Sequence, residues 1–340
     1  MKKIDISKLP ELIQALLDPK AYPDPPGQVE MVQTQISYVF LAGDYVYKIK
    51  KPVDMGFLDY TTLGKRLIYC RKEVELNRRL CPDAYLGVVT VTRDNGRIRI
   101  GGKGRVEEYA VKMLRLPQDA MMDVLLSENK VTPKMVEDVA AIIAEFHRRA
   151  AKSSAINKFG SIETITQIID ENFDQTEKYF DIIITRETFQ RIKAYAKDFL
   201  KANTPLFNKR IANGQIRDCH GDLHAAHICF HRGICIYDCI EFIDRLRYTD
   251  VAADVAFLAM DLDHYGRTDL SQTFVNAYVL ESGDKELMKL LNFYKCYRAY
   301  VRGKVGCFQY DDQYISASEK EKIITNAQTY FKLAESYIED

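Results

Sequence analysis

Two carboxylates flank a short predicted hairpin within residues 219–242. Asp222 precedes an apolar run at 228–230, and Asp238 follows a second run at 234–237, with a glycine-containing turn between them. Because a tight hairpin brings its two ends together, we expect the two carboxylates to lie near each other. The stretch also contains His220, His224 and His227. Carboxylates and imidazoles gathered at a strand end predict a site for a metal ion and a reacting hydroxyl group.

The same stretch resembles a motif of the aminoglycoside phosphotransferase and choline kinase family, whose members have a protein-kinase-like fold. That motif reads H-x-D-x-x-x-x-N and is followed by a strand hairpin and an Asp that binds Mg²⁺. His220 and Asp222 match its first two named positions, and Asp238 matches the later Asp. His227 stands where the family has Asn. The resemblance is closest to bacterial proteins called aminoglycoside phosphotransferase-like, and it extends to residues 39–60 and 253–263.

The resemblance implies an α+β, bilobal protein-kinase-like fold, with a small antiparallel-sheet N-terminal lobe and a mostly helical C-terminal lobe. Residues 1–117 would form the roof over the nucleotide, and residues 118–340 would hold the catalytic loop and the acceptor site. Alternation and turn residues predict strands at 29–33, 38–41, 45–50, 85–92, 97–100 and 109–114. Helical spacing predicts, among others, helices at 63–80, 250–262 and 285–307.

The resemblance also implies which residues contact ATP. Lys48 matches the strand lysine that touches the phosphates, and Glu73 matches the helix glutamate that pairs with that lysine. Strand alternation puts Lys48 and Lys50 on one face, so spacing alone leaves open whether Lys48 is instead a solvated lysine, as we expect Lys50 to be. The resemblance favours Lys48 as the phosphate ligand. The remaining nucleotide contacts are expected at the Thr34 and Ser37 hydroxyls, for phosphate, and at the backbone near Met113, for adenine.

Phosphoryl transfer needs reactants held in line while charge is neutralised, and the motif residues can supply these roles. Asp222 would accept the proton of the acceptor hydroxyl or orient that group, while His220 would brace the loop. Asp238 would bind Mg²⁺ through oxygen. His227 would ligate the metal or hold a metal-bound water, and because Mn²⁺ accepts nitrogen more readily than Mg²⁺ does, it favours Mn²⁺. Asp254 matches a family Asp that accepts hydrogen bonds from the catalytic-loop backbone.

The chain is therefore expected to be an ATP-dependent phosphotransferase, a kinase that acts on a hydroxyl of a small metabolite. Two alternatives stay open. The histidines and carboxylates of the motif could form a metal-dependent hydrolase site with zinc. The replacement of Asn by His227 could instead mark a pseudokinase, which binds nucleotide without turnover.

The acceptor is expected to carry an anionic group. Tyr294, Arg298 and Arg302 recur every four residues in the predicted 285–307 helix and so share one face. In the resembling fold, late helices wall the acceptor cleft, and arginine prefers carboxylate or phosphate partners. The alternative is a solvated or salt-bridged helix face.

The bulk composition narrows the set of partners. Lys plus Arg equals Asp plus Glu at 48 each, which gives no electrostatic footprint for nucleic acid or an anionic membrane. The N-terminus lacks a signal-peptide apolar core, and no apolar run approaches membrane-spanning length. We therefore expect a cytoplasmic protein whose partners are a nucleotide and a small-molecule acceptor. Its eight cysteines include no C-x-x-C pair and are expected to be reduced thiols.

Overall fold

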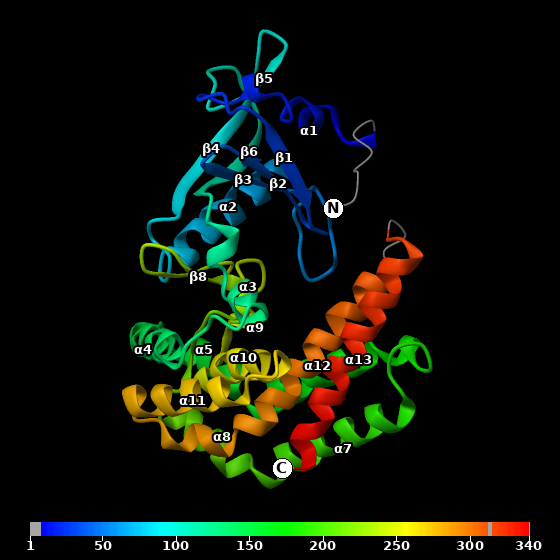
Figure 1. The fold of residues 1–340 in the computed structure, drawn as a ribbon. Helices are drawn as coiled ribbons and strands as arrows, with labels where there is room; N and C mark the ends of the chain where they lie inside the picture. The colour runs from blue at the N-terminus through cyan, green and yellow to red at the C-terminus, as the bar shows by residue number, and fades with distance from the viewer. Residues whose placement is uncertain (1–7, 312–314, 340) are drawn as a thin grey trace. The chain divides into compact units, whose positions relative to one another are not determined.

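The computed structural model describes residues 8–311 and 315–339, which form two compact units (Figure 1). Unit 1 is Met1–Met121 with Ile228–Ile243, and unit 2 is Met122–His227 with Asp244–Asp340. The predicted division into functional lobes after residue 117 stays a prediction. Among the described residues, no helix combines the length and apolar character needed to cross a membrane.

Unit 1 is built on a six-stranded antiparallel sheet with the strand order β1-β2-β3-β6-β4-β5. Its strands are β1 (Val29–Gln33), β2 (Ser37–Ala42), β3 (Tyr45–Lys50), β4 (Tyr85–Asp94), β5 (Arg97–Ile100) and β6 (Arg105–Leu114). The predictions for β1, β3 and β5 are confirmed residue for residue. Strand β6 begins at Arg105 rather than at the predicted Tyr109, because the extra residues pair with the end of β4.

The two faces of this sheet have different coverings. Helix α1 (Glu11–Ala15) and the short 3₁₀ turn η2 (Pro19–Ala21) belong to an apolar core that includes Tyr47 and Ile49 of β3. Helix α2 (Leu63–Asn77), which begins after the capping residue Thr62, contacts β4 and β6. Because side chains alternate along a strand, the lysines of β3 point away from the apolar core and toward α2.

The predicted hairpin of residues 228–237 is present and belongs to unit 1. Strands β8 (Ile228–Phe230) and β9 (Ile234–Ile236) pair antiparallel across a turn at residues 231–233. Arg232 and Gly233 have φ values of 52° and 119°, in the left-handed region that glycine adopts at little cost. The turn chemistry therefore fixes the register that presents Asp238 just beyond β9.

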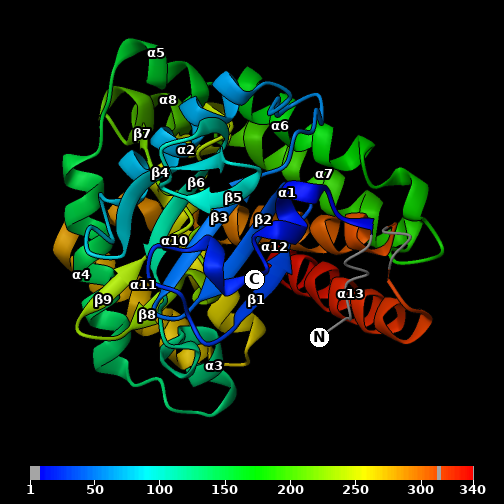
Figure 2. The same ribbon diagram turned by 90° about the horizontal axis from the view of Figure 1, so that it is seen from above.

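Unit 2 is mostly helical, as predicted, and its core is helix α10, whose residues 251–262 are all buried. Helices α12 and α13 run side by side (Figure 2), and α11 packs on both α4 and α10. The helices are α3 (Met122–Ser127), α4 (Pro133–Arg149), α5 (Ser154–Asn157), α6 (Ile162–Asp174), α7 (Arg186–Ala202), α8 (Thr204–Ala212), α9 (Asp244–Arg247), α10 (Val251–His264), α11 (Thr268–Ser282), α12 (Leu291–Tyr310) and α13 (Ala317–Glu339). Two short strands, β7 (Ile216–Asp218) and β10 (Tyr248–Asp250), pair antiparallel, and β7 leads directly into the segment that contains His220 and Asp222.

One cysteine expectation is wrong. Cys81, just after α2, forms a disulfide with Cys235 on β9, and their Cα atoms lie 4.7 Å apart. The other six cysteines are free and buried. Sequence spacing could not reveal the pair, because 154 residues separate the two partners. The bond ties the hairpin to the end of α2 within unit 1.

We predict that alkylation of the denatured, unreduced protein modifies six cysteines, and that prior reduction raises this number to eight. Mass spectrometry of the intact chain gives the count directly. Reduction should also lower the free energy of unfolding by about 2–4 kcal/mol, because the bond restrains the unfolded chain. Modification of all eight thiols without reductant would contradict the bond.

Candidate functional site

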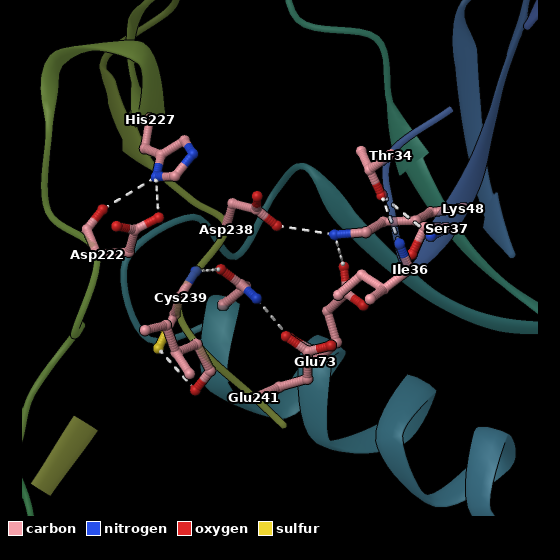
Figure 3. A network of polar contacts seen from close by, with 12 residues as sticks. Thr34, Ile36, Ser37, Lys48, Glu73, Asp222, His227, Asp238, Cys239 and Glu241 are labelled. Carbon is pink, nitrogen blue, oxygen red and sulfur yellow. Dashed lines mark hydrogen bonds and ion pairs between the residues drawn. The ribbon is translucent and has the colours of Figure 1, made fainter. Parts of the chain in front are cut away.

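The first group of site residues lies in unit 1, around Lys48 of β3. Lys48 Nζ is 2.9 Å from Glu73 Oε1 on α2 and 2.8 Å from Asp238 Oδ1 just beyond β9 (Figure 3). The side chain of Lys48 is 15% exposed, and that of Asp238 is 40% exposed. The predicted ion pair of Lys48 with Glu73 is thus confirmed, and the Asp238 side of the cluster is accessible. Contact of these residues with a nucleotide stays a prediction.

Mutual attraction keeps the lysine and the carboxylates of this cluster ionised. Burial by itself would lower the pKa of Lys48, but the carboxylates of Asp238 and Glu73 outweigh it and hold that pKa well above its ordinary value. Burial would likewise raise the pKa of Glu73, and the nearby lysines Lys48 and Lys50 reverse the effect and lower it. The site therefore presents a permanent positive charge between two carboxylates at neutral pH.

Lys50 is a second member of the cluster, and the expectation that it is solvated is wrong. It is 1% exposed, and its Nζ lies 2.7 Å from Glu73 Oε2 and 2.5 Å from Glu241 Oε1. The Tyr60 hydroxyl donates to the same Glu241 oxygen at 2.8 Å. Alternation correctly placed both lysines of β3 on one face. Glu241 stands three positions after Asp238 in the sequence, so the segment that follows β9 carries a second carboxylate.

Asp238 is held in a backbone conformation that a non-glycine residue rarely adopts. Its φ is 61°, which costs energy unless the surrounding structure imposes it. The next residue, Cys239, donates its amide to Asn77 Oδ1 at 2.8 Å, and the Asn77 side chain donates in turn to the Glu73 carbonyl at 2.8 Å. The end of α2 therefore fixes both Glu73 and the chain that carries Asp238 (Figure 3).

The other predicted nucleotide contacts lie in the same unit. The Thr34 hydroxyl accepts hydrogen bonds from the amides of Ile36 at 3.3 Å and Ser37 at 3.0 Å, and so closes the turn between β1 and β2. Ser37 is fully buried, while Met113 is half-buried on β6, opposite Val46 of β3. Their contacts with phosphate and adenine stay predictions.

The second group of site residues is a loop in unit 2 that contains His220 and Asp222. The amides of His220 and Gly221 donate to the two oxygens of Asp254 on α10, at 2.6 Å and 2.9 Å. This confirms the hydrogen bonds predicted for Asp254. His220 is 1% exposed, and its Nδ1 lies 3.2 Å from the Asp222 amide, an arrangement that suits a bracing role. The predicted proximity of Asp222 to Asp238 stays a prediction, because the two residues belong to different units.

Asp222 is surrounded by imidazoles. Its Oδ2 lies 3.6 Å from His224 Nε2 and 3.6 Å from His227 Nδ1, and the latter nitrogen is also 2.9 Å from the Asp222 carbonyl oxygen (Figure 3). Burial would raise the pKa of Asp222, but His224 and His227 outweigh it and leave the pKa well below its usual range. Such a weak base is better suited to orienting a hydroxyl than to storing its proton. One donor atom from each of the three residues lies within 4.8 Å of the others, so the group could also hold a metal ion.

The face of α12 that was expected to bind an anionic acceptor is largely buried and makes hydrogen bonds within the protein. Arg298 is 5% exposed and donates to the Gly221 carbonyl at 3.1 Å and the Ala253 carbonyl at 3.1 Å. Tyr294 is also buried. Nη2 of Arg298 also lies 3.9 Å from Asp254 Oδ1. The alternative of a salt-bridged face therefore holds for Arg298, which braces the loop that contains His220 and Asp222. Arg302 is half-buried, and its positive charge contributes to the lowered pKa of Asp222.

Comparison with known proteins identifies the family to which the chain is similar. Residues 107–291 match the model of the phosphotransferase enzyme family. Uncharacterised proteins of Mycobacterium tuberculosis (strain H37Rv) and Mycobacterium bovis are each 34% identical over 283 residues, which is 83% of this chain and 55% of the relative. The chain thus spans about half the length of the curated relatives it matches.

Two solved structures share the fold. Amicoumacin kinase, solved with AMP-PNP, Ca²⁺ and its substrate, matches with a TM-score of 0.53 at 12% identity, covering 98% of this chain and 96% of that one. A choline/ethanolamine kinase family protein from Mesorhizobium loti matches with a TM-score of 0.50 at 11% identity, covering 92% of each chain. The predicted α+β kinase-like fold, with an N-terminal antiparallel sheet and a helical C-terminal region, is confirmed.

The contacts of Asp254 predict a pH-dependent contribution to stability. Burial would raise the pKa of Asp254, but the hydrogen bond to His147 and the nearby side chains of His147, His220 and Arg298 lower it to about 2. Stability from this shift is complete above the unfolded-state pKa near 4, and it is lost as the pH falls toward 2. Replacing Asp254 with Ala should lower the free energy of unfolding by roughly 1–3 kcal/mol at pH 7, because two buried amides lose their acceptor.

Chemical denaturation of both proteins between pH 7 and pH 2 tests this expectation. The stability difference between wild type and Asp254→Ala should stay constant down to about pH 4 and then narrow. Equal stability at pH 7 would show that the loop amides do not depend on Asp254.

Proposed function

The chain belongs to the phosphotransferase enzyme family, and from this premise we propose that it is an ATP-dependent small-molecule kinase. It would transfer the γ-phosphate of ATP to a hydroxyl group of a small metabolite. The observation that carries the proposal is the position of Lys48, a half-buried and charged lysine between Glu73 and the accessible carboxylate of Asp238. A globular core does not need such a cluster, whereas phosphate transfer needs a fixed cation beside a metal-binding carboxylate.

Lys48 and Asp238 would have different roles at the phosphates: Lys48 would contact phosphate oxygens, and Asp238 would bind the metal ion. Lys48, with its orientation set by Glu73, would donate to phosphate oxygens and neutralise their charge. The partly exposed carboxylate of Asp238 suits a divalent cation, since hard cations prefer oxygen ligands. A bound Mg²⁺ or Mn²⁺ would supply charge neutralisation for the phosphates. Lys48 would then exchange its contact with Asp238 for contacts with phosphate.

Asp222 would orient the acceptor hydroxyl, and its surroundings define that task. Asp254 accepts hydrogen bonds from the loop backbone, so the backbone that carries the Asp222 side chain is held in place. Its low pKa keeps it an ionised hydrogen-bond acceptor over the whole physiological range. The prediction of an anionic acceptor now rests on Arg302 alone, because Arg298 is committed to backbone carbonyls.

The proposal includes a cytoplasmic location, where ATP is available, and a nucleotide and a small acceptor as partners. Two rivals are separated from it by simple measurements. A pseudokinase would bind nucleotide without consuming it. A metal-dependent hydrolase built on Asp222, His224 and His227 would retain zinc on purification and would not need Lys48.

The proposed function is tested by screening small hydroxyl-containing metabolites for acceptor-dependent ATP consumption with Mg²⁺ or Mn²⁺. Release of ADP together with a phosphorylated product is the expected outcome for at least one acceptor. Nucleotide binding with no turnover across the screen would favour the pseudokinase.

The two carboxylates should respond differently to substitution. Asp222→Asn should lower turnover at least about 100-fold and leave the Kd for metal–ATP nearly unchanged, because Asp222 serves the acceptor. Asp238→Asn should weaken metal–ATP binding at least about 10-fold, and lower turnover as well, because losing a metal ligand should cost no less than losing a residue that supports one. Nucleotide titrations and steady-state kinetics separate these effects, and Asp198→Asn, on the exposed surface of α7, is a matched control. Normal turnover by Asp222→Asn would exclude it from the chemistry.

His227 should bias the choice of metal. A histidine nitrogen in place of an amide oxygen favours Mn²⁺ relative to Mg²⁺, so Mn²⁺ should support turnover at least as well as Mg²⁺. His227→Asn should shift the ratio of the two rates toward Mg²⁺. The exposed turn residue His231 provides the control substitution, His231→Asn. If the Mn²⁺/Mg²⁺ ratio is the same in wild type and His227→Asn, His227 serves packing only.

A further inference from the structure

Lys50 is a buried cation that cannot itself contact a ligand. Its side chain has no exposed surface, and its ammonium group lies between the carboxylates of Glu73, at 2.7 Å, and Glu241, at 2.5 Å. It also lies 4.9 Å from the centre of the Tyr60 ring. Placing a lysine and a glutamate together in an apolar interior rarely increases stability over apolar residues of similar size. The pair therefore calls for a role other than packing.

The charges of the cluster show what Lys50 changes. Glu73, Glu241 and Asp238 carry three negative charges, and Lys48 and Lys50 carry two positive ones. Glu73 uses one oxygen for each lysine. If Lys50 were neutral, Lys48 alone would face all three carboxylates. Lys50 thus leaves Lys48 free to exchange one carboxylate for a phosphate.

The geometry shows what Lys50 holds. Glu241 follows Asp238 by three residues, and its carboxylate is fixed by Lys50 on one side and by the Tyr60 hydroxyl on the other. Between Asp238 and Glu241, the Cys239 amide donates a hydrogen bond to Asn77. The segment 238–241 is therefore anchored to β3 and α2, and this anchorage maintains the positive φ of Asp238.

We propose that Lys50 and Glu241 form a positioning pair, which keeps Asp238 oriented for the metal and Lys48 available for the phosphates. The inference rests on the proposed kinase function and assigns these two residues a part in it. Neither residue is a catalytic residue, since neither reaches the ligand. They act through Asp238 and Glu73, and so their effect should be seen in the coupling between metal and nucleotide.

The experiment measures the Kd of ATP by titration with and without Mn²⁺, on wild type and three variants. Lys50→Met removes the cation. The double variant Lys50→Met with Glu241→Gln removes one positive and one negative charge, so the net charge is unchanged, and the Gln oxygen can still accept from Tyr60. Lys103→Met is the control, because Lys103 is an exposed lysine of unit 1 in the loop between β5 and β6. Circular dichroism melts give the temperature below which each variant is folded.

The double variant should bind ATP normally without metal but about 10–100-fold more weakly than wild type with Mn²⁺, as expected when the support of a metal ligand is lost. Lys50→Met alone should weaken binding under both conditions, because Lys48 then faces an excess of negative charge. Lys103→Met should behave as wild type. If Lys50→Met does not fold, the charge-balanced double variant still decides the question.

Two negative outcomes are distinct. If wild type shows no ATP binding with either metal, the proposed function fails, and the positioning role fails with it. If wild type shows metal-dependent binding and the folded double variant shows the same dependence, the function stands and the positioning role is overturned.

Discussion

The ion pairs of the Glu73 carboxylate with Lys48 and Lys50 are the interactions on which the group of site residues in unit 1 depends. Each carboxylate oxygen of Glu73 contacts one of the two lysines that β3 directs toward α2. A carboxylate buried in this way is stable only when it is paired, and the pairing fixes the rotamers of Lys48 and Lys50 together. Through these lysines the same carboxylate is linked to Asp238 and Glu241, and thus to the hairpin of β8 and β9. The sheet, the helix and the hairpin therefore form one electrostatic unit.

A different carboxylate plays the corresponding part in unit 2. Asp254, in the first turn of the buried helix α10, accepts the amides of His220 and Gly221. Arg298 of α12 binds the Gly221 carbonyl from another direction. The loop that presents Asp222 is thus held by its backbone, and the Asp222 side chain lies beside His224 and His227.

Local sequence signals predicted the framework well and the long-range partners poorly. Alternation and glycine-containing turns located β1, β3 and β5, because these depend on neighbouring residues. The resemblance supplied the pairing of Lys48 with Glu73, which periodicity could not distinguish from a pairing with Lys50. The Lys50–Glu241 pair and the Cys81–Cys235 bond join residues more than 150 positions apart, and no local pattern encodes such contacts. Arg298 shows a further limit of local patterns. Helical spacing placed it correctly on one face with Tyr294 and Arg302, but it could not show that its guanidinium group bonds backbone carbonyls of the protein.

We propose that Lys48 and Asp238 separate to receive a metal-bound nucleotide. The most direct measurement is a crystal structure with Mn²⁺ and a non-hydrolysable ATP analogue, in which anomalous scattering locates the metal. We expect the metal beside an Asp238 oxygen, with Lys48 Nζ moved onto a phosphate oxygen and Glu73 still bound to Lys50. A metal bound instead by Asp222, His224 and His227, with the contact between Lys48 and Asp238 intact, would contradict the account.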